Sequence, residues 1–467
     1  TQGQTRWHTP PPSHMPDRLY SRVLALARAF AAGAQQVDAA VARGAMAVGR
    51  PPHMVRPVAE RYLATFSGRT RPRVREIVDF LIHDRAWKRR KRADQHTTRR
   101  GDAIRWTIES SSMQPVLAAA TWNVPSLVSV AALADWLELT AGELDWFSDV
   151  KARTTPAPSA RLHHYHYALR EKRHGGVRLI EAPQARLKAL QRRILSEILE
   201  QVPSYYTAAH GFVKGRSART FAAEHVAQRV VLRMDLQDFF PRIGGARVQA
   251  VFRALGYPEV VADLLGGLCT NVTPHAVFDA RRWPALTAVG LAEARRVYAR
   301  PHLPQGAPTS PALANLCAFR LDARLTGLAD WAGATYSRYA DDLAFSGGDE
   351  FARRVERYAT QIAVIAQEEG WQVQHHKTRV MRRGTRQQLV GLVVNERVNV
   401  SRADFDTLKA TLTNCARYGP DTQNRDRHPD FRAHLAGRVS WVASVNPAKG
   451  QRLRAIFEQI VWTDRAE

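Results

Sequence analysis

The chain has 467 residues, of which 45% are hydrophobic, and it carries 68 Lys and Arg against 43 Asp and Glu, a formal net charge of +25. This hydrophobic content excludes a disordered chain, and the length predicts two to four domains. No apolar run reaches the ~20 residues of a membrane helix, the first residues lack the apolar segment of a signal peptide, and the three scattered cysteines do not have the spacing of a zinc site. We therefore expect a cytoplasmic protein with a polyanionic partner, and on charge alone nucleic acid and an anionic membrane surface both stay open. The motifs described below favour nucleic acid and no membrane.

The first 150 residues are predicted to form a helical, basic N-terminal extension, because apolar residues recur at helical intervals over 19–48, 56–84 and 124–147. Between these helices, residues 85–105 contain nine Lys or Arg and only two Asp. This stretch is either a solvated helix face or a surface that contacts nucleic-acid phosphates, and both interpretations stay open. Its densest part consists of Lys88, Arg89, Arg90, Lys91 and Arg92. Residues 151–160, "KARTTPAPSA", have the composition of a linker.

The rest of the chain mixes predicted strands and helices, which indicates an α+β fold. Two short strands flank a Gly-Gly turn at 165–183, and an amphipathic helix follows from residue 185. A buried strand is predicted at 230–235, one helix at 310–329, a hairpin at 335–347 and a further strand pair at 389–400. From residue 401 the pattern is helical and basic.

Three carboxylates stand at the ends of predicted strands. Asp235 ends the apolar strand, and Asp341 and Asp342 lie where the hairpin turns. Such side chains can converge although 106 residues separate them, and clustered carboxylates are costly unless a cation neutralises them. Oxygen ligands suit Mg²⁺, and two such ions can serve the transfer of a phosphoryl group. The alternative for an Asp-Asp pair alone is a solvated turn.

Four strings occur in a fixed order: "HGFVKGRS" at 210–217, "MDLQDFF" at 234–240, "LPQGAPTSP" at 303–311 and "YADD" at 339–342. Together they resemble bacterial reverse transcriptases, and "LPQGAPTSP" with "YADD" resembles the palm in particular. With "LKALQRRIL" and "HHKTRV", the chain most closely resembles the bacterial retron type. The resemblance implies a right-hand polymerase with fingers at 151–232, a palm at 233–398 and a helical thumb at 399–467, after the extension at 1–150.

The resemblance also implies a role for each residue of these motifs. The catalytic and metal-binding acids would be Asp235, Asp341 and Asp342, with two Mg²⁺ ions, and Lys377 would protonate the departing pyrophosphate. Phe240 would exclude the ribose 2′-hydroxyl, and Gln305 would line the nascent base pair. Lys172 and Arg178 would contact the triphosphate of the incoming dNTP. Arg216 and Gly391, the latter in a hairpin that resembles the primer grip, would contact nucleic acid.

Two strings depart from the usual retron pattern. Retron enzymes usually have an Asn-Ala-x-x-His string, and here "FAAEH" has Phe221 in the position of the Asn. They also usually have Val-Thr-Gly before the primer-grip hairpin, and here "LVG" at 389–391 lacks the Thr. The chain is thus either a divergent retron enzyme or a member of a neighbouring defence-type lineage.

The expected function is an RNA-directed DNA polymerase that copies a structured non-coding RNA into DNA. By resemblance to retrons as a family, it would act in anti-phage defence with an effector protein. The alternatives are a template-independent, protein-primed or RNA-making polymerase, and a non-catalytic RNA-binding scaffold. Phe240 argues against ribonucleotides, and the three acids argue against a scaffold.

Overall fold

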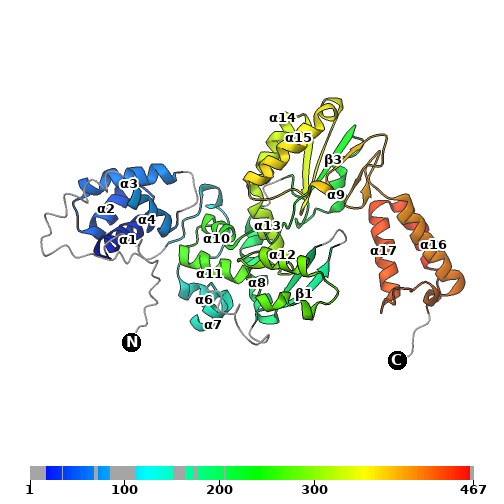
Figure 1. The fold of residues 1–467 in the computed structure, drawn as a ribbon, viewed down its shortest axis with the longest axis horizontal. Helices are drawn as coiled ribbons and strands as arrows, with labels where there is room; N and C mark the ends of the chain where they lie inside the picture. Colours follow the sequence, from blue (N-terminus) through cyan, green and yellow to red (C-terminus); the bar gives the residue numbers. More distant parts are fainter. Residues whose placement is uncertain are drawn as a thin grey trace. The chain divides into compact units, whose positions relative to one another are not determined.

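The computed structural model describes residues 17–33, 35–67, 72–84, 112–150, 163–172, 176–203 and 207–462. The chain forms two compact units, each made of two stretches of sequence (Figure 1). The first unit comprises Thr1–Val202 and Ile243–Leu313, and the second comprises Pro203–Arg242 and Ala314–Glu467. The basic stretch at 88–92 and the predicted linker at 151–160 lie outside the described residues.

The N-terminal part of the first unit is helical, as predicted. Its helices are α1 (Asp17–Ala31), α2 (Val37–Val48), α3 (Pro52–Phe66) and α4 (Val74–His83). They share one apolar core, in which the rings of Phe30 and Tyr62 stack with centroids 5.0 Å apart. The predicted helical pair near residue 140 is also present, as α6 (Val130–Leu137) and α7 (Ala141–Ser148). Thr140 caps α7, because its side chain accepts a hydrogen bond from the Glu143 N–H.

The remainder of the first unit is built on the predicted hairpin. Strands β1 (Tyr165–Glu171) and β2 (Val177–Pro183) pair antiparallel. The α-helices that follow are α8 (Ala185–Glu197), α10 (Gly245–Ala254), α11 (Glu259–Cys269) and α12 (Ala288–Tyr298). Single 3₁₀ turns lie at Leu117–Ala119, Leu199–Gln201, His275–Phe278 and Ala280–Arg282. Helix α12 packs on β2, and α11 packs against α7, α8 and α10.

The second unit contains a four-stranded antiparallel sheet with the strand order β4-β5-β3-β6. The strands are β3 (Val230–Asp235), β4 (Ala334–Tyr339), β5 (Asp342–Gly347) and β6 (Arg379–Arg382). Strand β3 lies inside the sheet and is buried at five of its six residues, which is why its sequence is apolar apart from the half-buried Arg233 and the terminal Asp235. The predicted hairpin at 335–347 is the β4–β5 pair.

Two helices, α14 (Phe319–Trp331) and α15 (Asp349–Glu368), pack on this sheet (Figure 1). The buried side of α15 carries Phe351, Val355, Tyr358, Ile362 and Ala366, at the three- and four-residue spacing of an amphipathic helix. The prediction of one helix over 310–329 was wrong. The chain forms α13 (Ser310–Cys317) and α14 instead, and the Ala318 N–H is shared between the Ala314 and Asn315 carbonyls, which tightens the turn.

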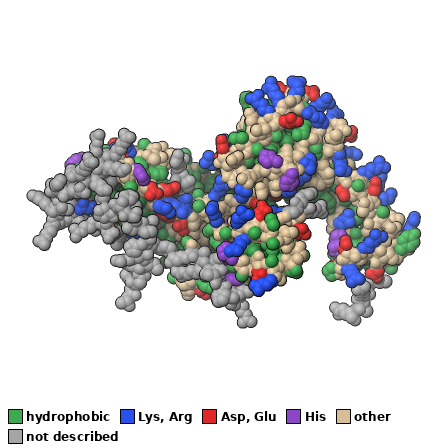
Figure 2. Space-filling model, viewed as in Figure 1, with side chains coloured by type: hydrophobic (Ala, Val, Ile, Leu, Met, Phe, Trp, Pro, Cys, Tyr) green, Lys and Arg blue, Asp and Glu red, His purple; other side chains and the backbone are tan. Residues whose placement is uncertain are grey.

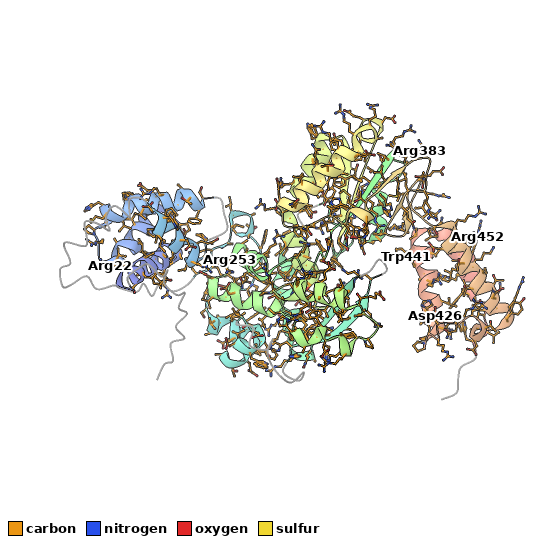
Figure 3. All side chains as sticks on the ribbon, in the orientation of Figure 1. Arg22, Arg253, Arg383, Asp426, Trp441 and Arg452 are labelled. Atoms are coloured by element: carbon orange, nitrogen blue, oxygen red, sulfur yellow. The ribbon has the colours of Figure 1, made fainter. Side chains whose placement is uncertain are left out.

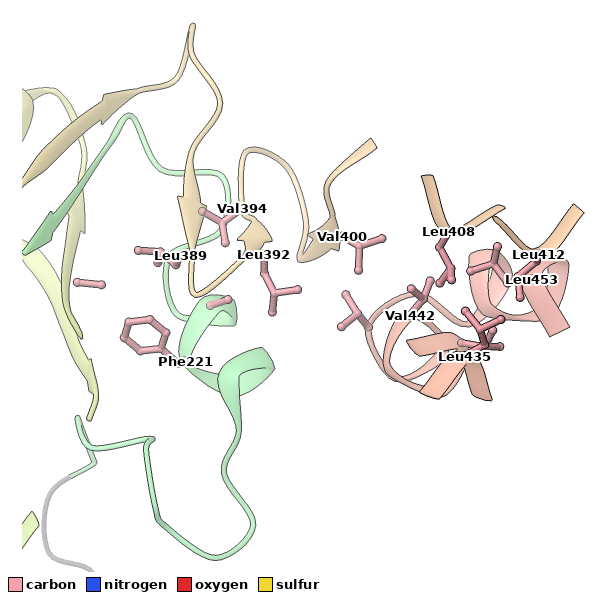
Figure 4. Close-up of a cluster of buried hydrophobic side chains, with 14 of the residues drawn as sticks. Phe221, Leu389, Leu392, Val394, Val400, Leu408, Leu412, Leu435, Val442 and Leu453 are labelled. Atoms are coloured by element: carbon pink, nitrogen blue, oxygen red, sulfur yellow. The ribbon is translucent and has the colours of Figure 1, made fainter. Parts of the chain in front are cut away.

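The C-terminal part of the second unit is mostly helical, as predicted. A small antiparallel sheet comes first, and its strands are β7 (Gln388–Leu389), β8 (Leu392–Val393) and β9 (Asn399–Val400). The α-helices are α9 (Ala218–Ala223), earlier in the chain, and α16 (Arg402–Tyr418), α17 (Phe431–Val445) and α18 (Pro447–Phe457). Two 3₁₀ turns lie at His375–Lys377 and Pro420–Thr422. One core of buried side chains runs from Phe221 on α9 through Leu392 to Leu412 and Leu435 (Figure 4).

The surface reflects the basic composition. Figure 2 shows Lys and Arg side chains over the region of α14 and α15 and over the C-terminal helices. Among the helices that the structure describes, none combines the length and the apolar character needed to cross a membrane.

Candidate active site

The three predicted carboxylates lie together at one end of the sheet in the second unit. Strands β3 and β5 are paired so that Asp235 stands opposite Asp342. The two residues between β4 and β5 are Ala340 and Asp341, and the Leu236 N–H donates a 2.9 Å hydrogen bond to the Asp341 carbonyl. The sheet register thus brings together the end of one strand and the turn of a hairpin. The metal-binding role of the three carboxylates stays a prediction.

Two cations accompany these carboxylates. Lys377 Nζ lies 2.8 and 2.9 Å from the two carboxylate oxygens of Asp235. Arg233 donates to Asp342 Oδ1 from Nε at 2.8 Å and pairs with it from Nη2 at 2.7 Å. Among the described residues, Asp341 has no ion-pair partner. The sequence motifs indicate Lys377, whereas no motif indicates Arg233, which lies within the predicted strand before Asp235.

The electrostatics reflect this crowding. Burial, followed by the charges of Asp235 and Asp342, raises the pKa of Asp341 to about 6. Burial also raises the pKa of Asp342, and Arg233 opposes that rise. Within the described part of the chain, no group of three or more His, Cys, Asp or Glu side chains forms a ready metal cage. Asp235 and Asp342 are instead turned towards Lys377 and Arg233.

The turn that carries Asp341 has a constrained backbone. Ala340 adopts φ 56°, a left-handed conformation that is uncommon for a residue with a Cβ. The segment "HGF" runs beside it, because the His210 N–H donates to the Arg338 carbonyl and the Arg338 N–H to the Ala208 carbonyl, both at 2.7 Å. A Cβ on Gly211 would lie 2.5 Å from the Ala340 nitrogen. The close approach of the Ala340 backbone therefore favours glycine at 211.

Phe240, the predicted sugar gate, is half-buried in the same unit. Its ring contacts those of Phe239 and Phe212, with centroids 5.6 and 5.9 Å away. Phe239 itself is buried and stacks on Trp371 at 6.0 Å. One ring of the Phe-Phe pair thus anchors the segment in the core, which leaves the other ring partly accessible.

The predicted triphosphate and base-pair residues all belong to the first unit. The Lys172 N–H donates to the Gly176 carbonyl and closes the β1–β2 turn, and Arg178 is exposed on β2. The Gln305 carbonyl accepts a 2.9 Å hydrogen bond from the Glu181 N–H on the same strand. Strand β2 and the "LPQG" loop therefore hold Arg178 and Gln305 on one local framework. They are not part of the unit that contains the three acids.

A buried polar network that the motifs did not indicate supports this loop. The Glu181 carboxylate is fully buried and accepts hydrogen bonds from Asn271, Thr273 and His302, each at 2.8 Å. Burial lowers the pKa of His302, but the Glu181 charge and the hydrogen bonds to Glu181 and to the Arg300 carbonyl together outweigh it, and the pKa is raised. A buried charge needs such partners, so the network ties the loop around Gln305 to β2.

The remaining candidates are the residues predicted to contact nucleic acid. Arg216 donates from Nη1 to the Ala209 carbonyl at 2.8 Å and to the Thr207 carbonyl, so it braces the loop that contains Gly211. Gly391 is exposed in the two-residue β7–β8 turn with φ 86°, a conformation that favours glycine. The cluster Lys88–Arg92 lies outside the described residues.

The two departures from the retron pattern have different structural settings. Phe221 is fully buried, and its ring contacts those of His210, His225 and Tyr339. His225 is also buried and bridges β4 and β5, because its two ring nitrogens lie 2.7 Å from Ser337 Oγ and Ser346 Oγ. Phe221 thus fills the core where the usual motif has a polar residue. Leu389, in "LVG", is fully buried next to the β7–β8 turn.

Comparisons with known proteins agree with the motifs. Residues 170–405, about half of the chain, match the family of reverse transcriptases (RNA-dependent DNA polymerases). The retron Mx65 reverse transcriptase of Myxococcus xanthus is 45% identical over 63% of this chain and 65% of its own length. The retron Mx162 enzyme of the same organism is 35% identical over 74% of this chain and 69% of its own.

More distant similarities extend beyond these two. The retron Ec86 reverse transcriptase of Escherichia coli is 29% identical over 59% of this chain and 74% of its own length. Among solved structures, telomerase from Candida albicans in complex with a fragment of telomeric RNA is 13% identical, with a TM-score of 0.31 over 62% of this chain and 56% of that chain. From the family match and the retron relatives, this chain belongs to the retron-type reverse transcriptases.

Proposed function

We propose that the chain is an RNA-directed DNA polymerase that copies a structured non-coding RNA into DNA by two-metal nucleotidyl transfer. The observation that carries the proposal is the convergence of Asp235, Asp341 and Asp342 at adjoining strand ends, beside Lys377, in a chain of this family. In this proposal the chain works as a right hand, with fingers at 151–232, a palm at 233–398 and a thumb from 399.

The donor set fits divalent magnesium. All three groups are carboxylates, the hard oxygen ligands that Mg²⁺ prefers. Their mutual repulsion helps to raise the pKa of Asp341, and a cation would remove that cost. Two Mg²⁺ ions, when bound, would activate the attacking hydroxyl and stabilise the leaving oxygen. Asp235, Asp341 and Asp342 would hold them, where Lys377 now pairs with Asp235 and Arg233 with Asp342.

The protein's own groups would then handle the nucleotide. Lys377 Nζ, a half-buried ammonium group, would give a proton to the departing pyrophosphate. The Phe240 ring would lie against the sugar and exclude a 2′-hydroxyl. Gln305 would contact the nascent base pair, and Lys172 and Arg178 the triphosphate.

RNA would be held largely by the basic surfaces. Figure 3 shows Trp441 and Arg452 on the C-terminal helices, and Trp441 is 44% exposed, as base stacking requires. Arg216, Gly391 and the cluster Lys88–Arg92 would add further contacts to nucleic acid. The proposed anti-phage role and effector partner are supported by retron family membership alone.

Primer extension tests the proposal. Wild-type protein, Asp235→Asn and Asp341→Asn are each given Mg²⁺, an RNA template with an annealed primer, and either dNTPs or NTPs. We expect template-dependent extension with dNTPs by the wild type only, while both variants keep its thermal unfolding temperature and its affinity for RNA.

Other outcomes identify the competing functions. Extension without a template, or with NTPs, would favour the template-independent or RNA-making polymerase. RNA binding by the wild type without any extension would favour the scaffold. Near-wild-type extension by either Asn variant would contradict the role given to that carboxylate.

A further inference from the structure

A buried ion pair lies directly behind the turn that carries Asp341. Arg338, in β4, is completely buried, and so is Asp322 on α14, with 0% and 1% of their side chains exposed. The pair is bidentate, since Arg338 Nε lies 2.7 Å from Asp322 Oδ1 and Nη2 lies 2.6 Å from Oδ2. The Tyr336 hydroxyl donates to the same Oδ1 at 2.9 Å.

The third guanidinium nitrogen reaches the catalytic turn. Arg338 Nη1 donates at 3.1 Å to the carbonyl of Ala340, the residue immediately before Asp341. It also donates at 3.1 Å to Asn315 Oδ1, and the Asn315 amide donates at 2.9 Å to the Gly211 carbonyl. Both sides of the strained Ala340 residue are therefore restrained: its carbonyl by Arg338, and its nitrogen by the backbone of Gly211 packed against it.

Stability alone does not account for such a pair. Removing two charges from water is costly, and buried ion pairs can often be replaced by apolar residues without loss of stability. What an apolar pair cannot supply is a planar fork with donors in fixed directions, and neither can lysine, whose charge is a single point on a flexible stem. The Arg338 guanidinium also lies 5.6 Å from the ring centroid of Phe239, the neighbour of Phe240.

We propose that Arg338, oriented by Asp322, is a positioning residue that fixes the Ala340 carbonyl and thereby the direction of the Asp341 carboxylate. This inference rests on the proposed function, since it assigns Asp341 to the reaction centre. Arg338 is not assigned a contact with the nucleotide or with the other acids. It acts through the turn, so its loss would lower the rate of the chemical step and leave ground-state binding of substrates nearly unchanged.

The test compares Arg338→Lys with Val355→Ala. The lysine variant keeps the charge and loses the fork. Val355 is buried on α15, which packs on β3 and β5, and it takes no part in the hydrogen bonds of the Arg338–Asp322 pair, so its truncation should lower stability through a cavity. Asn315→Ala is a milder second variant that leaves the Arg338–Asp322 pair intact. Each variant of the whole 467-residue chain is assayed below its unfolding temperature, with Asp235→Asn as the inactive reference.

We expect kcat for dNTP incorporation to fall about 10- to 100-fold in Arg338→Lys and less in Asn315→Ala, with KM and primer–template affinity within twofold of wild type. Val355→Ala should lose unfolding temperature and keep kcat. A second readout needs no catalysis: hydrogen exchange of the Leu236 amide, which donates to the Asp341 carbonyl, should quicken in metal-free Arg338→Lys and not in Val355→Ala.

The outcomes distinguish failure of the positioning role of Arg338 from failure of the proposed polymerase function. If kcat in folded Arg338→Lys stays within twofold of wild type, or falls only in proportion to stability as in Val355→Ala, the pair is structural and the inference is overturned. If Arg338→Lys does not fold, unchanged kcat and exchange in Asn315→Ala overturn it equally. A wild-type protein that extends no primer instead contradicts the proposed function.

Discussion

Gly211 offers a sharp test of how closely the protein is packed around Asp341. In Gly211→Ala the new Cβ would lie 2.5 Å from the Ala340 nitrogen, 3.2 Å from the Tyr339 carbonyl carbon and 3.3 Å from the Ala340 Cα. Ordinary contact begins near 3.4 Å, so the two segments must separate by about 0.9 Å. The atoms met are backbone atoms, which cannot rotate away as a side chain would. Because φ of Gly211 lies outside the left-handed region, the clash is the only penalty.

The expected result follows from that displacement. Overpacking of this kind costs about 1–3 kcal/mol of stability. A misplacement of about 1 Å at a reacting group can lower the rate about 100-fold. We therefore expect Gly211→Ala to remain folded, with an unfolding temperature a few degrees lower, and to lose between one and two orders of magnitude in kcat for primer extension.

The control is Gly348→Ala, directly after the end of the β4–β5 hairpin that contains Ala340. A Cβ there meets no atom within 4 Å, and φ is −78°. Its stability should stay within about 0.5 kcal/mol of wild type and its kcat should be unchanged. Both proteins are assayed by single-nucleotide incorporation under saturating dNTP, with unfolding followed by calorimetry. A Gly211→Ala protein with wild-type kcat would show that the turn moves freely, and the close-packing argument would fail.

Three further predictions concern other parts of the chain. Phe240→Ala should raise the kcat/KM for NTPs relative to dNTPs, because removal of the half-buried ring leaves room for a 2′-hydroxyl; an unchanged ratio would mean that another residue is the gate. Burial, and to a lesser extent the charge of His210, lowers the pKa of His225 to about 3. His225 therefore stays neutral in the folded protein, whereas in the unfolded chain it takes up a proton below pH ~6.5. The free energy of unfolding should thus decrease by about 1.4 kcal/mol per pH unit as the pH falls from ~6.5 towards 3. The unfolding temperatures of wild type and His225→Gln should therefore converge between pH 7 and pH 5, and a constant difference would contradict the assignment. Neutralising the basic cluster at residues 88–92 should weaken RNA binding. The slope of log K against log salt concentration should fall by roughly 0.7–0.9 for each phosphate that is no longer neutralised, while extension of a pre-annealed primer–template should change little. An unchanged slope would mean that the cluster is a solvated helix face. Its residues are Lys88, Arg89, Arg90, Lys91 and Arg92.

Local patterns predicted most of the elements. The alternation around the Gly-Gly turn predicted β1 and β2, and the apolar run before Asp235 predicted a buried strand, which β3 is. Both patterns are set by neighbours within a few positions along the chain, so periodicity reveals them. The same reasoning missed the interruption between α13 and α14, because nothing in the composition around Ala318 breaks a helix.

The sequence by itself determined the family and the residues of the motifs, because strings such as "YADD" and "LPQG" are contiguous and can be read without a fold. It also indicated that Asp235 and Asp341 would converge, since both stand at strand ends. Only the tertiary structure decided which groups surround them. The ion pair of Arg233 with Asp342, the ion pair of Asp322 with Arg338, and the close approach of Gly211 to Ala340 join positions 16 to 129 residues apart. Their partners are chosen by sheet register and helix packing, and no local periodicity encodes those choices.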